Sequence, residues 1–392
     1  MVNMRVRTVR TLLVTILVLV CMVSSVLSVS AAFVPSQAVP FANMSNGGNK
    51  YIYSDNPEML WDGTGTQGNG WVNNFNGRSG AYTTEETLAV NTLYDAYFYH
   101  INKTTSKNIK VGVYIYATTA GTVTTLNKSV ANTGTSSFPD YEMCANVETG
   151  YQKSTNYTTQ SLAAGTGTFI ASDQIGPLTL VNGHVMFKVS SSMKCRIVFY
   201  DASVTTINPN TLGKAIPMST GTTATFVGDV KYADYNYNSV STNGSHGFYL
   251  ATAGSDMSFN TGEYETGSNA INSNNQLMGN YGRVYNMVLS NCAGKTLRIT
   301  PDWGTIWNSS SGTWLVREAL AYCPGGSTSS WTYKKIHSIY NKRETGQTTP
   351  TSYTGTELTY IDVVVPAGNN SYNFKFILPG SNFGNVYFKF IN

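Results

Sequence analysis

The chain has 392 residues, of which 41% are hydrophobic, 12% are aromatic and 12% are charged. Charged residues usually make up about 25% of a globular protein, and the 25 basic residues outnumber the 21 acidic ones by only four. This balance excludes the strongly basic surface that binds nucleic acids or anionic lipids. The aromatic content excludes an intrinsically disordered chain.

Residues 1–32 have the pattern of a secretory signal peptide. Three arginines precede the apolar run Leu12–Val23, and the small residues of Val29–Ala32 follow as a cleavage site. The apolar run is shorter than the roughly 20 residues of a transmembrane helix. We therefore expect a secreted protein, extracellular or at the cell surface, with no stable membrane insertion after cleavage. Without the three signal arginines, 22 of the 25 basic residues remain against 21 acidic ones, so the mature chain is nearly neutral.

The rest of the chain is long enough for two domains. Residues 33–50 contain two prolines and a Gly-Gly pair, which is typical of a flexible leader. Tyr94–Ala117 and Tyr281–Gly304 form a weak internal repeat, because each contains an aromatic-rich strand, a polar turn and a second alternating strand. We predict a first β-sandwich domain at 51–235 and a second at 236–392.

Short alternating or apolar segments between turn residues predict an all-β fold of two tandem, jelly-roll-like β-sandwiches. The clearest strand patterns are Leu93–Ile101, Ile109–Ala117, Val185–Val189, Cys195–Tyr200, Tyr281–Leu289, Thr296–Ile299, Leu358–Val365, Tyr372–Leu378 and Val386–Ile391. Thr83–Leu93 and Thr313–Tyr322 are the two segments with a pattern of short helices, and Glu85 and Glu86 would lie in a first helical turn. The last strand, Val386–Ile391, is predicted either as an exposed edge or as part of the core.

The ends of the two halves also look alike. Val185–Val189 follows a small-residue turn by about twenty residues, and Val386–Phe390 follows a similar turn in the second half. In both strands apolar positions alternate with a lysine, so one face can pack while the other faces water. This similarity supports two tandem copies and predicts that these two strands correspond.

The stretch from Tyr99–Asn102 to Ile109–Val111, with the sequence YHINKTTSKNIKV, resembles a segment of uncharacterised secreted β-sandwich proteins of Gram-positive bacteria. The resemblance covers one hairpin and implies a bacterial, extracellular β-domain. It implies no catalytic residue.

Four cysteines follow the signal peptide: Cys144, Cys195, Cys292 and Cys323. An even number in an exported chain permits two disulfides, Cys144 with Cys195 and Cys292 with Cys323. Buried, unpaired thiols are the alternative, and both interpretations stay open. The cysteines lack the paired spacing of a zinc ribbon.

The sequence contains no catalytic motif that we recognise, and we expect a non-enzymatic protein. The four histidines are scattered and lack metal-site spacing. Glu263 and Glu265 share a strand face and are the closest carboxylates for a hydrolase of unrecognised type. We predict no cofactor. The alternative is a structural calcium ion held by loop aspartates, of which the candidates are Asp55, Asp62, Asp256 and Asp302.

Aromatic residues among glycines and asparagines are the remaining candidates for ligand binding. They are Trp61, Trp71, Trp303, Trp307, Trp314, Tyr235 and Tyr237. Such rings suit sugars or protein partners, and the alternative is that they cover the ends of a sandwich. We predict a structural or self-assembling surface or matrix protein that forms homo-oligomers. The alternative function is binding of an extracellular polysaccharide, and nucleic acid is not expected as a partner.

Overall fold

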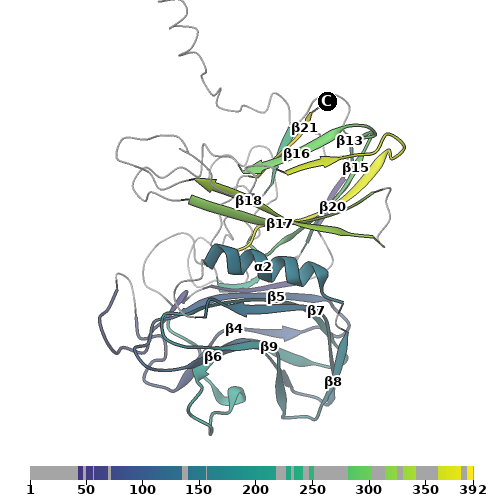
Figure 1. Ribbon diagram of the computed structural model, residues 1–392. Coiled ribbons are helices and arrows are strands. Elements are labelled where there is room, and N and C mark those ends of the chain that lie inside the picture. Colours follow the sequence, from purple (N-terminus) through teal and green to yellow (C-terminus); the bar gives the residue numbers. More distant parts are fainter. Residues whose placement is uncertain are drawn as a thin grey trace, which may run out of the picture. The chain divides into compact units, whose positions relative to one another are not determined.

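Two pairs of stacked β-sheets form the body of the protein, which confirms the predicted all-β class (Figure 1). This computed structural model describes residues 43–46, 50–55, 57–68, 72–134, 140–155, 157–217, 227–230, 234–241, 247–250, 281–301, 314–324, 330–340, 361–380 and 386–391. In these ranges the helices are α2 (Asp140–Lys153) and the 3₁₀ helix η1 (Pro209–Thr211). No helix in this described part is long and apolar enough to cross a membrane.

The first sandwich is built from one large and one small sheet. The large sheet has the order β12 (Val227–Val230), β2 (Lys50–Ser54), β5 (Tyr94–Asn102), β10 (Leu180–Val189), β7 (Gly121–Asn132) and β8 (Thr158–Leu162), and β3 (Met59–Leu60) also pairs with β5. The small sheet has the order β4 (Gly80–Leu88), β11 (Met193–Asp201), β6 (Ile109–Ala117) and β9 (Gly167–Ile175). Alternate residues of both sheets, such as Val111, Val185 and Ile197, face each other in one apolar core.

The second sandwich repeats this plan. Its large sheet has the order β1 (Asn43–Asn46), β13 (Asp234–Ser241), β15 (Val284–Ser290), β20 (Ser371–Ile377), β17 (Trp314–Pro324) and β18 (Thr332–Tyr340). Its small sheet has the order β14 (Gly247–Leu250), β21 (Val386–Ile391), β16 (Thr296–Pro301) and β19 (Ile361–Val364). Phe374, Phe376 and Phe388 lie in the core between the two sheets.

The two sandwiches correspond strand by strand. β2 and β5 pair in parallel, as do β13 and β15. The short β3 also pairs with β5 in parallel, whereas the other neighbours in the two large sheets pair antiparallel. The predicted repeat is matched in this topology, because β5 and β6 occupy the places that β15 and β16 occupy in the second sandwich. The predicted match of the two ends is wrong, since β10 corresponds to β20 and β21 corresponds to β11.

The first strand of each copy completes the sheet of the other copy. β1 precedes β2 in the chain but pairs with β13, and β12 precedes β13 but pairs with β2. The predicted leader 33–50 therefore contains a paired strand and the first residue of β2, which corrects its description as flexible. Sheet membership changes between β12 and β13, near the predicted boundary at 235/236, and the division into separately folding domains stays a prediction.

Both predicted helices are strands. Thr83–Leu93 contains most of β4, where Glu85 accepts hydrogen bonds from Lys194 and Arg196 of β11. Thr313–Tyr322 coincides with β17, whose partners are β18 and β20. Strand pairing, with β11 for β4 and with β18 and β20 for β17, supplies hydrogen bonds and packing that outweigh a weak helical preference. The alternative of the C-terminal strand as an edge is also wrong, because β21 lies between β14 and β16.

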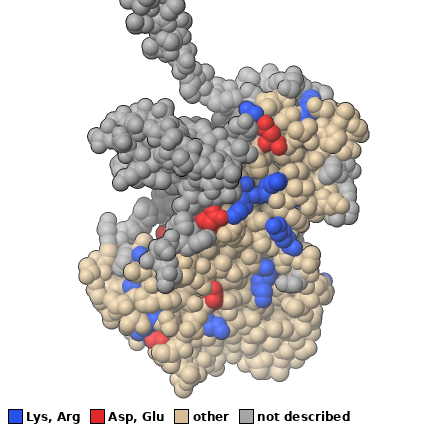
Figure 2. Space-filling view, in the orientation of Figure 1, with Lys and Arg blue, Asp and Glu red and all other residues tan. Residues whose placement is uncertain are grey.

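The helix α2, which the sequence analysis did not predict, links the two copies. It contacts β7 and β10 of the first sandwich and β17 and β18 of the second. Glu142 of α2 accepts a hydrogen bond from Lys335 of β18 at 2.5 Å, and Tyr151 packs in one apolar cluster with Val284 and Ile377. Charged side chains are sparse on the visible face of the described residues (Figure 2), as the composition implies.

Candidate functional site

A fully buried histidine lies where α2 packs on the large sheet of the first sandwich. Nε2 of His184 on β10 lies 2.8 Å from Oδ1 of Asp95 on β5, and Nδ1 lies 2.7 Å from Oε2 of Glu148 on α2. The ring of Tyr151 on α2 stacks on the imidazole at 3.7 Å, and its hydroxyl donates to Asp95 at 2.8 Å. We call these four side chains the His184 cluster.

The charges of the two carboxylates in the His184 cluster determine the protonation state of His184. Burial by itself would lower the pKa of His184, but the charges of Glu148 and Asp95 outweigh burial and raise it to about 10. The ring is therefore an imidazolium. Burial raises the pKa of Glu148, and the charge of His184 opposes this rise. The buried guanidinium of Arg283 lies 5.2 Å from the ring of Tyr51, which meets His184 edge-on.

A second buried histidine shows what the carboxylates do. His100 on β5 contacts the carbonyl oxygen of Pro57 through Nδ1 at 2.8 Å and the hydroxyl of Ser54 through Nε2 at 3.1 Å. Without a carboxylate partner, burial lowers the pKa of His100 to about 4. The opposite charge states of His100 and His184 thus follow from α2, which brings Glu148 to the sheet.

The His184 cluster is closed to solvent, and this limits its chemistry. His184 and Glu148 are 0% exposed and Asp95 is 1% exposed. A substrate has no access to these groups in this geometry. Because a paired buried charge is strongly destabilised when its partner is removed, we interpret the cluster as the attachment of α2 to the sheet.

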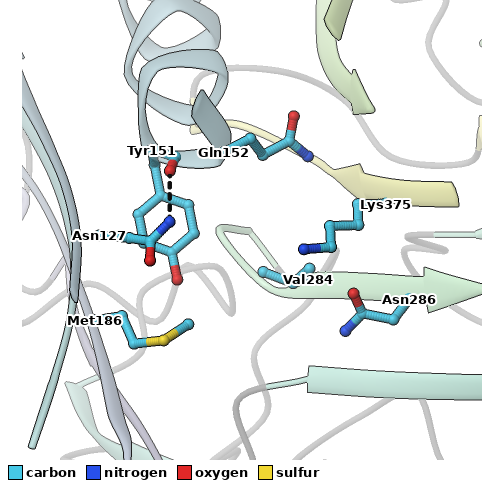
Figure 3. A pocket seen from close by; sticks show the side chains of 7 residues that line it. All are labelled: Asn127, Tyr151, Gln152, Met186, Val284, Asn286 and Lys375. Atoms are coloured by element: carbon cyan, nitrogen blue, oxygen red, sulfur yellow. Dashed lines mark hydrogen bonds between the residues drawn. The ribbon is translucent and has the colours of Figure 1, made fainter. Parts of the chain in front are cut away.

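A pocket of about 110 Å³ opens beside the cluster, at the C-terminal end of α2 (Figure 3). Its lining residues come from both sandwiches: Asn127, Tyr151, Gln152, Met186, Val284, Asn286 and Lys375. Met186 and Asn127 are cross-strand neighbours on β10 and β7, and Asn286 and Lys375 are cross-strand neighbours on β15 and β20. The two copies therefore supply opposite walls, and α2 supplies Tyr151 and Gln152.

A third feature is the outer face of the small sheet in the first sandwich. Core residues such as Ile115 and Phe199 alternate along its strands with residues that must point outward. The outward residues include five aromatic side chains, which we call the aromatic face: Tyr82, Tyr114, Tyr116, Phe169 and Tyr200. All are partly exposed except Tyr114, which is 5% exposed.

Three rings of the aromatic face form a connected group. The ring centroids of Tyr114 and Phe169 are 5.0 Å apart, and those of Phe169 and Tyr200 are 6.1 Å apart. Lys110 Nζ lies 4.8 Å from the Phe169 centroid. Arg196, also outward-facing, donates to the carbonyl oxygens of Pro209 and Asn210, so η1 covers part of this face.

The sequence analysis missed the aromatic face, although its signal is present in the chain. In the run Ile109–Ala117, Tyr114 and Tyr116 alternate with Val113 and Ile115. A period of two with an apolar core face places both tyrosines on the opposite face.

The predicted aromatic ligand residues lie in different places. Trp61 is 7% exposed, and its indole N–H donates to the carbonyl of Thr64 at 2.6 Å. Little of the Trp61 ring is therefore open to a ligand in this structure. Trp314 begins β17 and Tyr235 and Tyr237 lie in β13, where the structure describes the backbone only. The remaining predicted residues lie outside the described ranges: Trp71, Trp303, Trp307, Glu263, Glu265, Asp256 and Asp302.

The four cysteines are buried free thiols, so neither predicted disulfide is formed. Cys195 lies in the core of the first sandwich, whereas Cys144 lies on α2 in a separate apolar cluster with Tyr51 and Tyr97. Packing inside different apolar groups keeps these two residues apart. Cys292 lies in the core of the second sandwich.

The loop aspartates that the structure describes interact with other side chains of the same protein. Asp62 forms an ion pair with Lys107 at 2.6 Å and accepts hydrogen bonds from Thr64. Asp55 accepts a hydrogen bond from the hydroxyl of Tyr53 at 2.9 Å. The part of the chain that the structure describes holds no group of three or more side chains arranged to bind a metal ion.

Comparisons with known proteins add little to this geometry. No protein-family model and no curated protein matches the chain. Among solved structures, the N-terminal CBM22-1–CBM22-2 tandem domain of Paenibacillus barcinonensis Xyn10C is similar over 72% of this chain and 76% of that one. The identity is 10% and the TM-score is 0.15, and at this level the similarity supports no functional conclusion.

Proposed function

We propose that this chain is a secreted, non-enzymatic protein that binds an extracellular polysaccharide on the aromatic face of its first sandwich. The observation that carries the proposal is the group Tyr114, Phe169 and Tyr200 on the outer side of a sheet whose inner side is core. Aromatic rings at a surface normally mark a binding site when they gather in this way.

The composition of the aromatic face suits a sugar. The faces of pyranose rings are apolar and can stack on aromatic rings, while their hydroxyl groups need hydrogen-bond partners. Ser172 and Gln174 face outward on β9 opposite Gly112 and Lys110 of β6. Gly112 leaves no space for a side chain, because a Cβ there would lie 2.3 Å from the carbonyl oxygen of Ala171. The outer face therefore carries no side chain at Gly112, between Lys110 and Tyr114 of the same strand.

Binding without catalysis fits the placement of the ionisable groups. The ionisable side chains of the His184 cluster lie close together but are buried. The carboxylate Glu85 beside the aromatic face is held by Lys194 and Arg196. Burial tends to raise the pKa of Glu85, but these two cations outweigh it and lower the pKa. Glu85 therefore stays ionised and is a poor general acid.

The test is retention on insoluble glycans, measured by depletion and by affinity electrophoresis. We expect Phe169→Ala and Tyr200→Ala each to weaken binding by about five- to tenfold, because an aromatic contact contributes roughly 1 kcal/mol beyond burial. Tyr157→Ala is the matched control, since Tyr157 is 65% exposed but lies before β8, away from the small sheet. Retention that is absent for the wild type, or equal in all four proteins, would refute the proposal.

Self-association is a second candidate function, favoured by one strand. β8 pairs with β7, and among the described strands none pairs with its other edge. Thr158–Ser161 are exposed and β8 contains no charge or proline, the devices that usually protect an edge. We expect light scattering to detect oligomers of the wild type and monomers of Thr159→Lys. Monomers of the wild type at high concentration would exclude assembly through β8.

A further inference from the structure

We infer that the pocket at the end of α2 is a binding site for a carboxylate with a neighbouring hydroxyl group. This site is separate from the aromatic face and does not depend on the proposed polysaccharide function. The inference rests on the polar lining of the pocket, on its single cation and on its volume (Figure 3).

Gln152 supplies the first argument. It lies in the last turn of α2, and Figure 3 shows its carboxamide on the side of the pocket that Lys375 also lines. Both polar atoms of this carboxamide are buried and have no hydrogen-bond partner among the described residues. A buried amide without a partner costs about 1–3 kcal/mol. A bound group that accepts from Nε2 and donates to Oε1 removes this cost, and a hydroxy acid can do both.

Charge supplies the second argument. Among the described residues that line the pocket, Lys375 carries an ammonium group and none carries a carboxylate. Figure 3 shows Nζ directed into the pocket, and it lies 4.8 Å from the centroid of Trp331. Hydrogen bonds between an ammonium and a carboxylate are roughly twice as strong as neutral ones. The single positive charge of the Lys375 ammonium group balances the charge of a monovalent anion.

The position at a helix C-terminus restricts the choice of anion. The partial negative charge of this end disfavours anions, but Asn127 donates to the terminal carbonyl oxygens of Tyr151 and Ser154, each at 3.1 Å, and reduces the effect. Phosphate prefers helix N-termini and several cations. A carboxylate is therefore the better match for this pocket.

Volume supplies the third argument. A pocket of about 110 Å³ corresponds to three or four water molecules, at about 30 Å³ each, or to about four non-hydrogen atoms when compared with a 150 Å³ cavity that holds benzene. Glycolate is close to this size. A uronic acid is larger, so it would insert only its carboxylate edge. Glycolate and a uronic acid both present a carboxylate beside a hydroxyl or ether oxygen.

The test compares glycolate with glycolamide, a neutral molecule of the same shape, by ligand-observed NMR titration of the full chain. We expect glycolate to bind at least about tenfold more tightly. Lys375→Met should remove this preference, while Lys334→Met, which removes an exposed lysine of β18, should leave it unchanged. Titration with glucuronate against glucose distinguishes a uronic acid from a free hydroxy acid.

Gln152→Glu keeps the inference testable if Lys375→Met does not fold. It adds a negative charge to the lining at nearly constant size, so glycolate binding should be lost and glycolamide binding retained. Equal affinity of glycolate and glycolamide for the wild type, or glycolate binding that survives Gln152→Glu, would overturn the inference. Tighter binding of inorganic phosphate than of glycolate would overturn the choice of a carboxylate.

Discussion

The first and second sandwiches have the same strand order but differ at the connection between the last two strands of each large sheet. Between β7 and β8 the first sandwich contains α2, whereas only seven residues separate β17 (Trp314–Pro324) from β18 (Thr332–Tyr340). The large sheet under α2 carries His184 and Asp95, and the corresponding face in the second sandwich carries Val284, Asn286 and Lys375. The buried charged cluster therefore lies where α2 adds Glu148 and Tyr151 to the residues of the sheet.

The comparison predicts that the largest loss of stability comes from separating α2 from its sheet. Glu148→Gln removes one of the two carboxylate partners of the imidazolium of His184, and breaking a buried ion pair costs about 3–5 kcal/mol. Denaturant unfolding measures this loss directly. An unchanged midpoint would show that Glu148 does not hold the cluster together.

Stability should also decrease at alkaline pH. The folded pKa of His184, about 10, lies above its unfolded value of 6.5. Its contribution is therefore complete below pH 6.5 and is lost as the pH rises toward 10, by at most about 1.4 kcal/mol per pH unit. Unfolding is best measured between pH 6 and 9, before tyrosines begin to ionise. A flat profile over this range would contradict an imidazolium in the folded protein.

A smaller difference in stability is expected between glycine substitutions in the two sandwiches. Gly112→Ala should destabilise the first sandwich by about 1–3 kcal/mol, because the new Cβ meets the backbone of Ala171 and Ser172. Gly368→Ala is the matched control in the second sandwich, where no atom of the described residues is recorded within 4 Å of such a Cβ. Thermal unfolding of both variants tests this difference, and equal effects would argue against the close approach of β6 and β9.

The smallest effect is expected from a surface ion pair. Arg298 of β16 donates to both carboxylate oxygens of Asp362 on β19, each at 2.8 Å. Both side chains are about one-third exposed, so Asp362→Ala should cost at most about 1 kcal/mol. A loss as large as that from Glu148→Gln would remove the distinction between buried and exposed pairs.

Much of the fold was predictable because the strands carry their own pattern. Ile109–Ala117 and Val386–Ile391 were predicted with the bounds that β6 and β21 have. Their apolar residues alternate, and that alternation persists whatever the strands pair with. The segment of α2 was missed because Asp140–Lys153 has no strong apolar stripe, so its helix depends on packing against two sandwiches.

The candidate sites were less predictable, since each joins residues from distant strands. Asp95, Glu148 and His184 are separated by dozens of residues, and nothing near His184 in the chain indicates a carboxylate partner. The pocket residues Asn127 and Lys375 belong to different sandwiches. Only the aromatic face had a local signal, in the alternation around Tyr114 and Tyr116.

The sequence by itself determined an all-β chain with two similar halves, low charge and no recognisable catalytic motif. These properties depend on composition and on the period of two along each strand, which are local. The tertiary structure alone decided that β1 and β12 exchange sheets, that the cysteines are buried thiols and that His184 is charged. Each of these depends on which distant residues come into contact, and short-range patterning does not specify such contacts.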